Sequence, residues 1–213
     1  METAIRQARP DDAHFLSWVI HTAGRGHVQR GIWDVILGRP ERECLDFFKL
    51  LAVSTIPHLY HYSCFLVAEA NGKPTAALAG CDPEVCGYPA LAQALTQVFG
   101  ELGWPAPDAA WHERSQRVLC CLPDTVDGAW TVESVATAPE FRRRGLVDKL
   151  LVTILDQGRD RGFKRSQINI YIGNTPAQKA YEKHGFRIID EKRHPSFEEE
   201  TGSPGMARLL RDL

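Results

Sequence analysis

The sequence predicts a single α/β domain built around a mixed sheet. Strand-like segments dominate the beginning and the end of the chain, and segments with helical periodicity lie between them. Two of these strands, expected at 64–70 and 75–81, flank Asn71-Gly72, which is the strongest short signal for a hairpin. Neither an internal repeat nor an interdomain linker divides residues 1–213, so we expect one domain.

Before the hairpin, the sequence predicts one strand and two helices. Residues Ile5 to Arg9 alternate as in a short strand, and Asp11 or Asp12 is suited to cap the helix that follows. The glycine-rich stretch 24–34 predicts a flexible loop, and Pro40 begins the second helix.

Residues 82–127, between the third and fourth strands, predict a helical insert. Pro89 begins an amphipathic helical pattern that ends at Gly103, and Pro107 begins another. Three roles for the insert stay open: it shapes a pocket, it makes a dimer contact, or it covers an edge of the sheet.

The stretch 130–162 predicts a strand, a tight basic turn and a long helix. The β-branched residues between Trp130 and Pro139 favour the strand. From Leu146 to Leu155, apolar pairs recur every four residues and form one stripe along a helix.

The turn before this helix is suited to bind phosphate. Arg142, Arg143, Arg144 and Gly145 lead directly into the helix, whose first backbone N–H groups have no partners and attract anions. Gly145 has no Cβ, so an anion can approach the backbone closely. A solvated basic turn that caps an ordinary helix is the alternative.

The rest of the chain predicts a strand, a helix, a strand, a loop and a last strand. Pro176 is suited to the first position of the helix, and the loop is polar and rich in glycine and proline. These five segments are expected at 166–172, 175–184, 186–191, 194–205 and 206–210.

The composition excludes several classes of protein. Hydrophobic residues make up 44% of the chain and charged residues 24%, which is ordinary for a soluble globular protein. The net charge of −2 argues against general binding to nucleic acid or to anionic membranes. No signal-peptide core and no apolar run of membrane-spanning length is present, so we expect a cytoplasmic protein without nucleic-acid or membrane partners.

The cysteines and histidines do not predict a metal site. The six cysteines show no paired C-x-x-C spacing, and most lie in apolar runs, so we expect reduced core residues rather than zinc ligands. His58 and His61 have a spacing compatible with a metal, but no acidic or thiol ligand is adjacent. We expect surface or partly buried histidines there and no metal.

Two segments resemble the GNAT family of N-acetyltransferases. The family signature, Gln/Arg-x-x-Gly-x-Gly/Ala after a strand, fits Arg142 to Val147 except that Val147 replaces the last small residue. The second feature is the segment NTPAQKAYEKHGF, from Asn174 to Phe186, which is close to the family's usual sequence at this place. Together the two motifs cover the chain from Trp130 to about Asp190.

The resemblance implies a fold and a reaction. The fold would be a mixed, mostly antiparallel sheet of about six to seven strands flanked by helices. The reaction would be an acyltransferase reaction that moves an acetyl group from acetyl-CoA to a primary amine by direct attack, without a metal. The alternative is a non-catalytic acyl-CoA-binding regulatory module, which would need neither a catalytic acid nor a base.

The resemblance also implies which residues bind acetyl-CoA. Backbone groups of the central strand would hold the pantetheine arm, the basic turn would wrap the pyrophosphate, and an asparagine side chain would bind the arm. The residues are Val135, Ala136, Thr137, Arg142, Arg143, Arg144, Gly145, Leu146, Val147, Asp148 and Asn174.

Tyr181 and Glu133 are the expected catalytic residues. By the resemblance, the Tyr181 hydroxyl is the general acid for the departing thiolate, and Glu133 is the leading general base. Tyr181 lies about two helical turns after Asn174, so both can face one cleft. On an alternating strand, Glu133 would share a face with Val135 and Thr137. A core tyrosine and a structural or substrate-orienting carboxylate are the alternatives.

The acceptor is expected to be a small-molecule or peptide amine, and a homodimer stays open. In the resembled family, the connection between the first two helices often lines the acceptor pocket, which makes His27 and Trp33 candidates for substrate contact. Trp104 and Trp111 in the insert are candidates for apolar walls of the same pocket.

Overall fold

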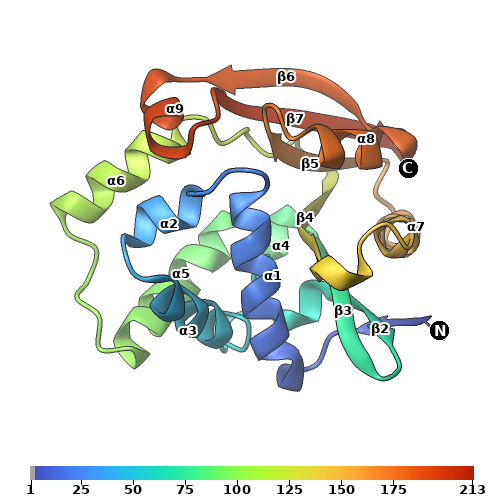
Figure 1. Cartoon of the computed structure of the whole chain (residues 1–213), viewed down its shortest axis with the longest axis horizontal. Helices are drawn as coiled ribbons and strands as arrows, with labels where there is room; N and C mark the ends of the chain where they lie inside the picture. The colour runs from blue at the N-terminus through green and yellow to red at the C-terminus, as the bar shows by residue number, and fades with distance from the viewer. Residues whose placement is uncertain (1–2) are drawn as a thin grey trace.

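Within residues 3–213, the chain folds around one seven-stranded sheet with the strand order β1-β2-β3-β4-β5-β7-β6. The structure is a computed structural model that describes residues 3–213 (Figure 1). Among the described strands, β4 and β5 run parallel and every other neighbouring pair is antiparallel, which confirms the predicted mixed sheet. The strands are β1 (Thr3–Gln7), β2 (Phe65–Ala70), β3 (Lys73–Cys81), β4 (Ala129–Thr137), β5 (Arg165–Tyr171), β6 (Arg187–Arg193) and β7 (Gly205–Asp212).

Helices precede the hairpin, fill the insert and follow the central strands. Before β2 come α1 (Ala13–Arg25), α2 (Ile32–Leu37) and α3 (Glu41–Leu51). The predicted insert between β3 and β4 is confirmed and contains α4 (Pro83–Cys86), α5 (Tyr88–Glu101) and α6 (Ala109–Leu119). The others are α7 (Leu146–Asp160), α8 (Thr175–Lys183) and α9 (Pro195–Thr201). No helix within residues 3–213 has both the length and the apolar character needed to cross a bilayer.

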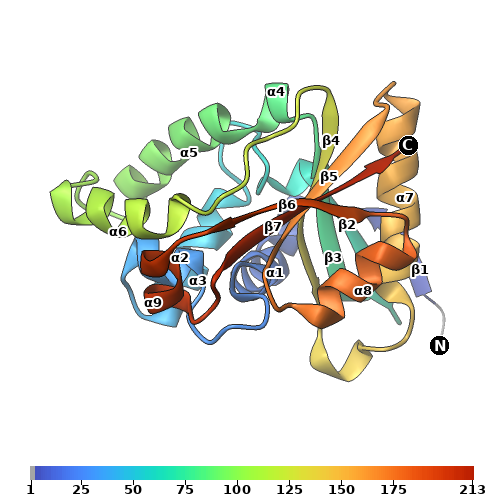
Figure 2. The same cartoon turned by 90° about the horizontal axis from the view of Figure 1, so that it is seen from above.

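Two hydrophobic clusters lie on opposite faces of the sheet. Alternate residues of β3 separate them: Ala77 and Ala79 face the cluster with α1, α3 and α5, whereas Ala76 and Leu78 face the cluster with α7. Removing both faces from water is the main driving force of folding. Figure 2 shows that α5 and α6 lie at one end of the molecule and α7 and α8 at the other.

The sheet opens between its two parallel strands. β4 and β5 pair only from Ala129 to Val132, opposite Arg165 to Ile168. Beyond Val132, β4 pairs with β3 alone, so its other edge keeps backbone N–H and C=O groups that β5 does not use. The opening gives a ligand access to the middle of the sheet.

β4 carries a bulge at the start of this free segment. On β3, Ala79 and Ala77 are two residues apart, but their partners on β4, Glu133 and Ala136, are three residues apart. The extra residue bends the strand, and Ser134 within the bulge has φ = 53°, which is uncommon for a residue other than glycine.

The predicted loop at 24–34 is confirmed for residues 26–31 and wrong at both ends, where helices extend into it. α1 continues to Arg25 and α2 begins at Ile32, so the connection is short. Gly26 ends α1 with φ = 58°, and its N–H donates to carbonyls of the preceding turn. Asp34 accepts from the backbone N–H of Gly31 at 2.8 Å, which caps the start of α2. The glycines therefore end helices rather than form a long flexible loop.

The predicted loop at 194–205 is also wrong, because α9 occupies most of it. The ring of His194 accepts a hydrogen bond from the backbone N–H of Ser196 at 3.2 Å and caps the helix. Phe197 is fully buried and anchors the helix, while Glu198 and Glu199 are exposed and Glu200 is mostly buried in ion pairs with Arg30 and Arg117. One buried aromatic residue gave too weak a periodic signal to predict this helix.

His58 and His61 are both buried, so their expected placement at or near the surface is wrong. His58 Nε2 lies 3.1 Å from the Leu51 carbonyl and 3.2 Å from Ser54 Oγ. Burial lowers the pKa of His58 to about 4. Neutral imidazoles with backbone partners fix the turn that follows α3. None of the six cysteines forms a disulfide; Cys44, Cys64, Cys81 and Cys121 are buried as expected, whereas Cys86 is partly exposed and Cys120 exposed.

Candidate active site

A cavity of about 700 Å³ lies where β4 and β5 separate. Its walls come from β4, β5 and α8 on one side and from α1, α2, α5 and α6 on the other. It is therefore formed where the helices of the N-terminal half and the insert meet the opening in the sheet, and its size is typical of a small-molecule site.

The free edge of β4 forms one wall. Val135, Ala136 and Thr137 line the cavity, in the segment of β4 that does not pair with β5. An extended ligand can add to such an edge by backbone hydrogen bonds. The hydroxyl of Thr137 is buried without a hydrogen-bond partner among the described residues.

The start of α7 is shaped to hold an anion. Arg143 has φ = 59° and Gly145 has φ = 72°, and this alternation turns successive backbone N–H groups outward. The first backbone bond at this end runs from the Lys149 N–H to the Gly145 carbonyl, at 3.2 Å. A Cβ on Gly145 would meet only Asp148 Oδ2, at 3.9 Å, so the space beside the turn is open. These features suit a phosphate group.

The three arginines of this turn are exposed and have different neighbours. Arg142 lines the cavity, and its Nε donates to the Thr137 carbonyl at 3.3 Å. Arg144 donates to the Glu140 carbonyl at 2.8 Å and lies over the Phe141 ring. Arg142 therefore extends positive charge from the turn to the cavity wall.

The remaining predicted cofactor residues on α7 differ in how they are placed. Val147 lines the cavity, whereas the side chain of Leu146 is buried in the cluster under α7. Asp148 accepts from Lys183 Nζ at 2.7 Å and from His184 Nε2 at 2.9 Å, which joins α7 to the end of α8. These hydrogen bonds hold the pKa of Asp148 below its usual value. Only the backbone of Leu146 and Asp148 is left to meet a ligand at the turn.

Asn174 and Tyr181 face the same cavity from α8, as their spacing predicts. Asn174 caps the helix, with its Oδ1 accepting from the Ala177 N–H at 3.4 Å, and its side chain also lines the cavity. Tyr181 is 6% exposed and lines the cavity two turns later. No described residue forms a hydrogen bond with its hydroxyl, which is free to meet a ligand.

Glu133 lies on β4 inside the cavity and has no positive partner among the described residues. Burial raises its pKa to about 7, although the Ser134 N–H partly offsets this effect. Burial also raises the pKa of Tyr181, and the charge of Glu133 adds to that rise. The two groups are therefore close enough to interact electrostatically.

The bulge corrects the predicted placement of Glu133. Val132 and Val135 both pack toward α7, whereas Ala136 belongs to the cluster on the opposite face. Because the face alternates along a strand, Glu133 lies on the face opposite Val135 and Thr137, not on the same face. Glu133 still lines the cavity, since the opening exposes both faces of β4.

Of the four residues predicted to contact the acceptor, two line the cavity and two do not. Trp33 and Trp111 line the cavity, from α2 and α6. His27 lies outside the lining, with its ring 6.2 Å from the ring of Tyr171. Trp104 is not part of the lining either; it stacks on Phe47 at 5.6 Å, inside the cluster between α3 and α5.

Several lining residues carried no sequence signal. Tyr60 follows a turn after α3, and Tyr88 begins α5. Desolvation raises the pKa of the Tyr60 hydroxyl and of the Tyr88 hydroxyl, although 39% of the Tyr88 residue is exposed, and the charge of Glu133 contributes to both shifts. They line one cavity with Glu133 only because segments far apart in the sequence pack together, and no local pattern predicts such an arrangement.

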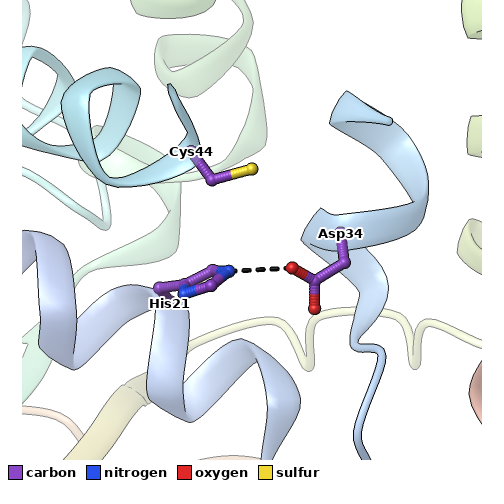
Figure 3. A group of neighbouring side chains, drawn as sticks. All are labelled: His21, Asp34 and Cys44. Atoms are coloured by element: carbon purple, nitrogen blue, oxygen red, sulfur yellow. Dashed lines mark hydrogen bonds and ion pairs between the residues drawn. The ribbon is translucent and has the colours of Figure 1, made fainter. Parts of the chain in front are cut away.

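His21, Asp34 and Cys44 form a second group of ionisable side chains (Figure 3), and none of the three lines the cavity. Their ligand atoms lie within 4.8 Å of one another. Asp34, however, accepts hydrogen bonds from His21 Nε2 at 2.8 Å, from Arg25 Nε at 2.8 Å and Nη2 at 3.0 Å, and from the Gly31 N–H at 2.8 Å. Both carboxylate oxygens are thus fully used.

The Cys44 thiol beside His21 and Asp34 is not in the thiolate form that binds a metal. Burial raises the pKa of Cys44 to about 11, and its Sγ lies 3.5 Å from the Arg39 carbonyl. Arg25 also donates to Glu41 of α3 at 2.7 Å. The group therefore joins α1, α2 and α3 as a structural network, and it holds the helix that carries Trp33.

Comparison with known proteins identifies the family. A model described as the acetyltransferase (GNAT) family matches residues 39–186. None of the curated proteins matches the chain. The structure resembles the crystal structure of an acetyltransferase, with a TM-score of 0.71 and 17% identity over 98% of each chain.

Two further solved structures share this fold. An N-acetyltransferase from Staphylococcus aureus Mu50 aligns with a TM-score of 0.64 and 21% identity, over 97% of this chain and 99% of that chain. The ribosomal-protein-S18-alanine N-acetyltransferase from Escherichia coli aligns with a TM-score of 0.53 and 14% identity, over 99% and 94%. The family model spans most of the chain, from the end of α2 to the end of the second motif, and the protein belongs to the acetyltransferase (GNAT) family.

Proposed function

We propose that this protein is an acyltransferase that moves the acetyl group of acetyl-CoA to a primary amine by direct attack. The observation that carries the proposal is that one cavity collects the free edge of β4, the cap residue Asn174 and two ionisable groups, Glu133 and Tyr181. Acetyl transfer from acetyl-CoA is the chemistry of the family, which supports the reaction class.

Acetyl-CoA would bind along the free edge of β4 and across the start of α7. Backbone groups from Val135 to Thr137 and the Asn174 side chain would hold the pantetheine arm. The N–H groups around Gly145 would hold the pyrophosphate, with charge from Arg142. The thioester supplies the acetyl group, and its thiolate leaves.

Glu133 would act as the general base. Its pKa of about 7 leaves it partly ionised at neutral pH, so it can accept a proton from the incoming ammonium, directly or through a water. No cation among the described residues pairs with the carboxylate, so it is available to a cationic substrate. An amine made neutral in this way can attack the thioester carbonyl.

Tyr181 would act as the general acid. Burial and the charge of Glu133 raise the pKa of its hydroxyl, so the proton stays on the oxygen at neutral pH. A protonated phenol inside the cavity can donate this proton to the departing thiolate. The acid and the base would thus act from α8 and β4 on the two sides of the reacting carbonyl.

A regulatory module that binds acyl-CoA without catalysis is the second candidate. It would account for the free edge of β4 and the phosphate turn equally well. It would not account for an unpaired carboxylate with a raised pKa beside a buried tyrosine hydroxyl, because burying such a charge costs stability. The catalytic function therefore explains more of the cavity.

The test is to incubate the protein with acetyl-CoA and a panel of small-molecule and peptide amines while measuring free thiol. An acetyltransferase releases thiol at a rate that depends on the amine, and mass spectrometry finds the acetylated product. Acetyl-CoA binding without amine-dependent thiol release would support the regulatory module, and failure to bind acetyl-CoA would contradict both candidates.

A further inference from the structure

The cavity has two chemically different ends. The cofactor end is bounded by the free edge of β4, by Arg142 and by α8. The far end is bounded by α1, α2, α5 and α6, and its lining is aromatic and aliphatic. It includes Trp33, Ile36, Tyr60, Leu91, Leu95 and Trp111.

The far end offers no positive charge to an acceptor. Among the lining residues of the described chain, Glu133 and Arg142 alone have charged side chains, and Arg142 lies at the cofactor end. Two arginines of the neighbouring α6 are engaged elsewhere: Arg114 Nε lies 3.5 Å from the Ile36 carbonyl, and Arg117 bonds to the carboxylates of α9. A carboxylate or phosphate on the acceptor would be buried there without a partner, which is costly.

Two polar groups near the far end differ in their partners: the Tyr171 hydroxyl is committed, whereas Trp111 Nε1 is buried without a hydrogen-bond partner among the described residues. The hydroxyl of Tyr171 donates to the Gly24 carbonyl at 2.5 Å and accepts from the Ile32 N–H at 2.9 Å. The rings of Trp33 and Tyr60 meet edge to face, with centroids 5.7 Å apart. A peptide acceptor would bury amide groups against these rings, and each unpaired amide would cost free energy.

One group at the boundary between the two ends can recognise an amine. Glu133 supplies negative charge, and aromatic rings nearby favour an ammonium group over an anion. Glu133 lines the same cavity as Tyr60 and Tyr88, which belong to its aromatic end. The charge of Glu133 also contributes to the raised pKa of both tyrosines. An ammonium group would therefore sit at Glu133, with its apolar body toward α5 and α6.

We propose that the acceptor is a primary amine on a compact aromatic or aliphatic body without a second charged group, such as an arylalkylamine. The inference rests on the proposed function and narrows it, because it excludes amino acids, phosphorylated amines and peptide N-termini as preferred acceptors. The inference depends on one observation: the apolar far end of the cavity adjoins the carboxylate of Glu133, which has no cationic partner among the described residues.

The experiment compares matched acceptors that differ by one charge. Phenethylamine and phenylalanine differ by a carboxylate, as do tryptamine and tryptophan, and kcat/KM is measured for each with saturating acetyl-CoA. We expect each amine without the carboxylate to be at least about tenfold better than its partner. Calorimetric titration of the same amines into the protein loaded with coenzyme A should give the same order of affinity.

A variant and a matched control sharpen the comparison. Ala92 is exposed on α5 and lines the cavity, so Ala92→Arg places a cation at the far end without disturbing the core. Gln93 is exposed on the same helix and lies outside the cavity. Ala92→Arg should raise the kcat/KM of phenylalanine relative to phenethylamine by at least about fivefold, through the new ion pair. Gln93→Arg should leave this ratio unchanged.

The outcomes distinguish a failure of the acceptor inference from a failure of the proposed acetyltransferase function. Equal or better acetylation of phenylalanine, tryptophan or a peptide N-terminus by the unmodified protein would overturn the inference and leave the acetyltransferase function standing. An absence of thiol release with every amine would overturn the proposed function and the inference together. An unchanged ratio in Ala92→Arg would show that the acceptor does not occupy the α5 end.

Discussion

Glu133 of β4 and Tyr181 of α8 line the same cavity, and the charge of Glu133 adds to the rise in the pKa of Tyr181 that burial causes. Glu133 lies on a bulge, where the strand has parted from β5, and Tyr181 lies two helical turns after the cap residue Asn174. The two groups come from separate elements, so their proximity is a property of the fold.

The pH dependence of the reaction tests the role of Glu133. With a pKa of about 7, the carboxylate is the active form, so kcat/KM should rise with pH and level off above about pH 8. Glu133→Gln removes the base and should lower kcat/KM by at least about 100-fold and abolish this limb of the profile. Glu182→Gln, on the exposed side of α8, is the control and should keep the profile. A titration near pH 7 that persists in Glu133→Gln would assign the base to another group.

The same substitution should stabilise the protein. The pKa of Glu133 rises from an ordinary 4.5 to about 7 on folding, so the native state binds the proton more tightly than the unfolded state. The free-energy penalty for burying the charged carboxylate is therefore absent below about pH 4.5, where the group is protonated in both states. The penalty grows as the pH rises and is complete above pH 7. At pH 8, Glu133→Gln should raise the free energy of unfolding by about 1 to 3 kcal/mol, and at pH 4 the two proteins should be alike. Denaturant titrations at both values measure this, and equal stability at pH 8 would mean that the carboxylate is not desolvated.

The turn at Gly145 is tested against a glycine at the other end of the same helix. Gly145 and Gly162 both have positive φ, 72° and 91°, and the space beside each is open. Valine is strained to a similar degree at either position, but only at Gly145 would it crowd a phosphate. Gly145→Val should weaken acetyl-CoA binding by at least about 1 kcal/mol in calorimetry, and Gly162→Val should not. Equal affinities of the two variants would place the pyrophosphate elsewhere.

We expect Asp34 to stabilise the packing of α1 and α2, and thereby the acceptor side of the cavity. Burial alone would raise its pKa, but hydrogen bonds from His21, Arg25 and the Gly31 N–H outweigh it and hold the pKa well below the ordinary 3.8. The stability that these bonds provide is therefore present above pH 3.8 and is lost as the pH falls toward the lower folded pKa.

Asp34→Asn leaves Arg25 and His21 without their anion and should lower the free energy of unfolding at pH 7 by about 2 to 4 kcal/mol. Because α2 carries Trp33, the acceptor KM should rise while acetyl-CoA affinity is retained. Asp46→Asn, exposed on α3, is the control. A variant with unchanged thermal stability would mean that the network contributes little.

Local patterns predicted the parts of the fold that local chemistry determines. The Asn71-Gly72 turn has φ of 51° and 74°, as a tight hairpin turn requires, and its two strands follow from it. The spacing of Asn174 and Tyr181 on one helix likewise places both in one cleft. Each of these relations spans a few residues of one element.

Relations between distant segments could not be predicted in the same way. The bulge at Ser134 depends on how β4 pairs with β3, so a strictly alternating pattern gave the wrong face for Glu133. The sequence predicted the same role, as apolar pocket walls, for Trp104 and Trp111 of the insert. Packing instead places Trp104 in the core against Phe47, and only Trp111 lines the cavity. Such choices depend on the tertiary arrangement of several helices.

The exchange of Tyr181 for Phe tests the account's central claim, which is that this cavity performs amine acetylation with Tyr181 as the proton donor. Tyr181→Phe keeps the ring, which packs edge to face on Phe186 at 6.2 Å, and removes only the hydroxyl. Because general acid catalysis contributes about 100- to 10,000-fold, kcat should fall by at least about 30-fold even with some rescue by water. Acetyl-CoA affinity and Tm should stay close to those of the unmodified protein. Full activity of Tyr181→Phe, with acetyl transfer shown to be rate-limiting, would contradict the claim.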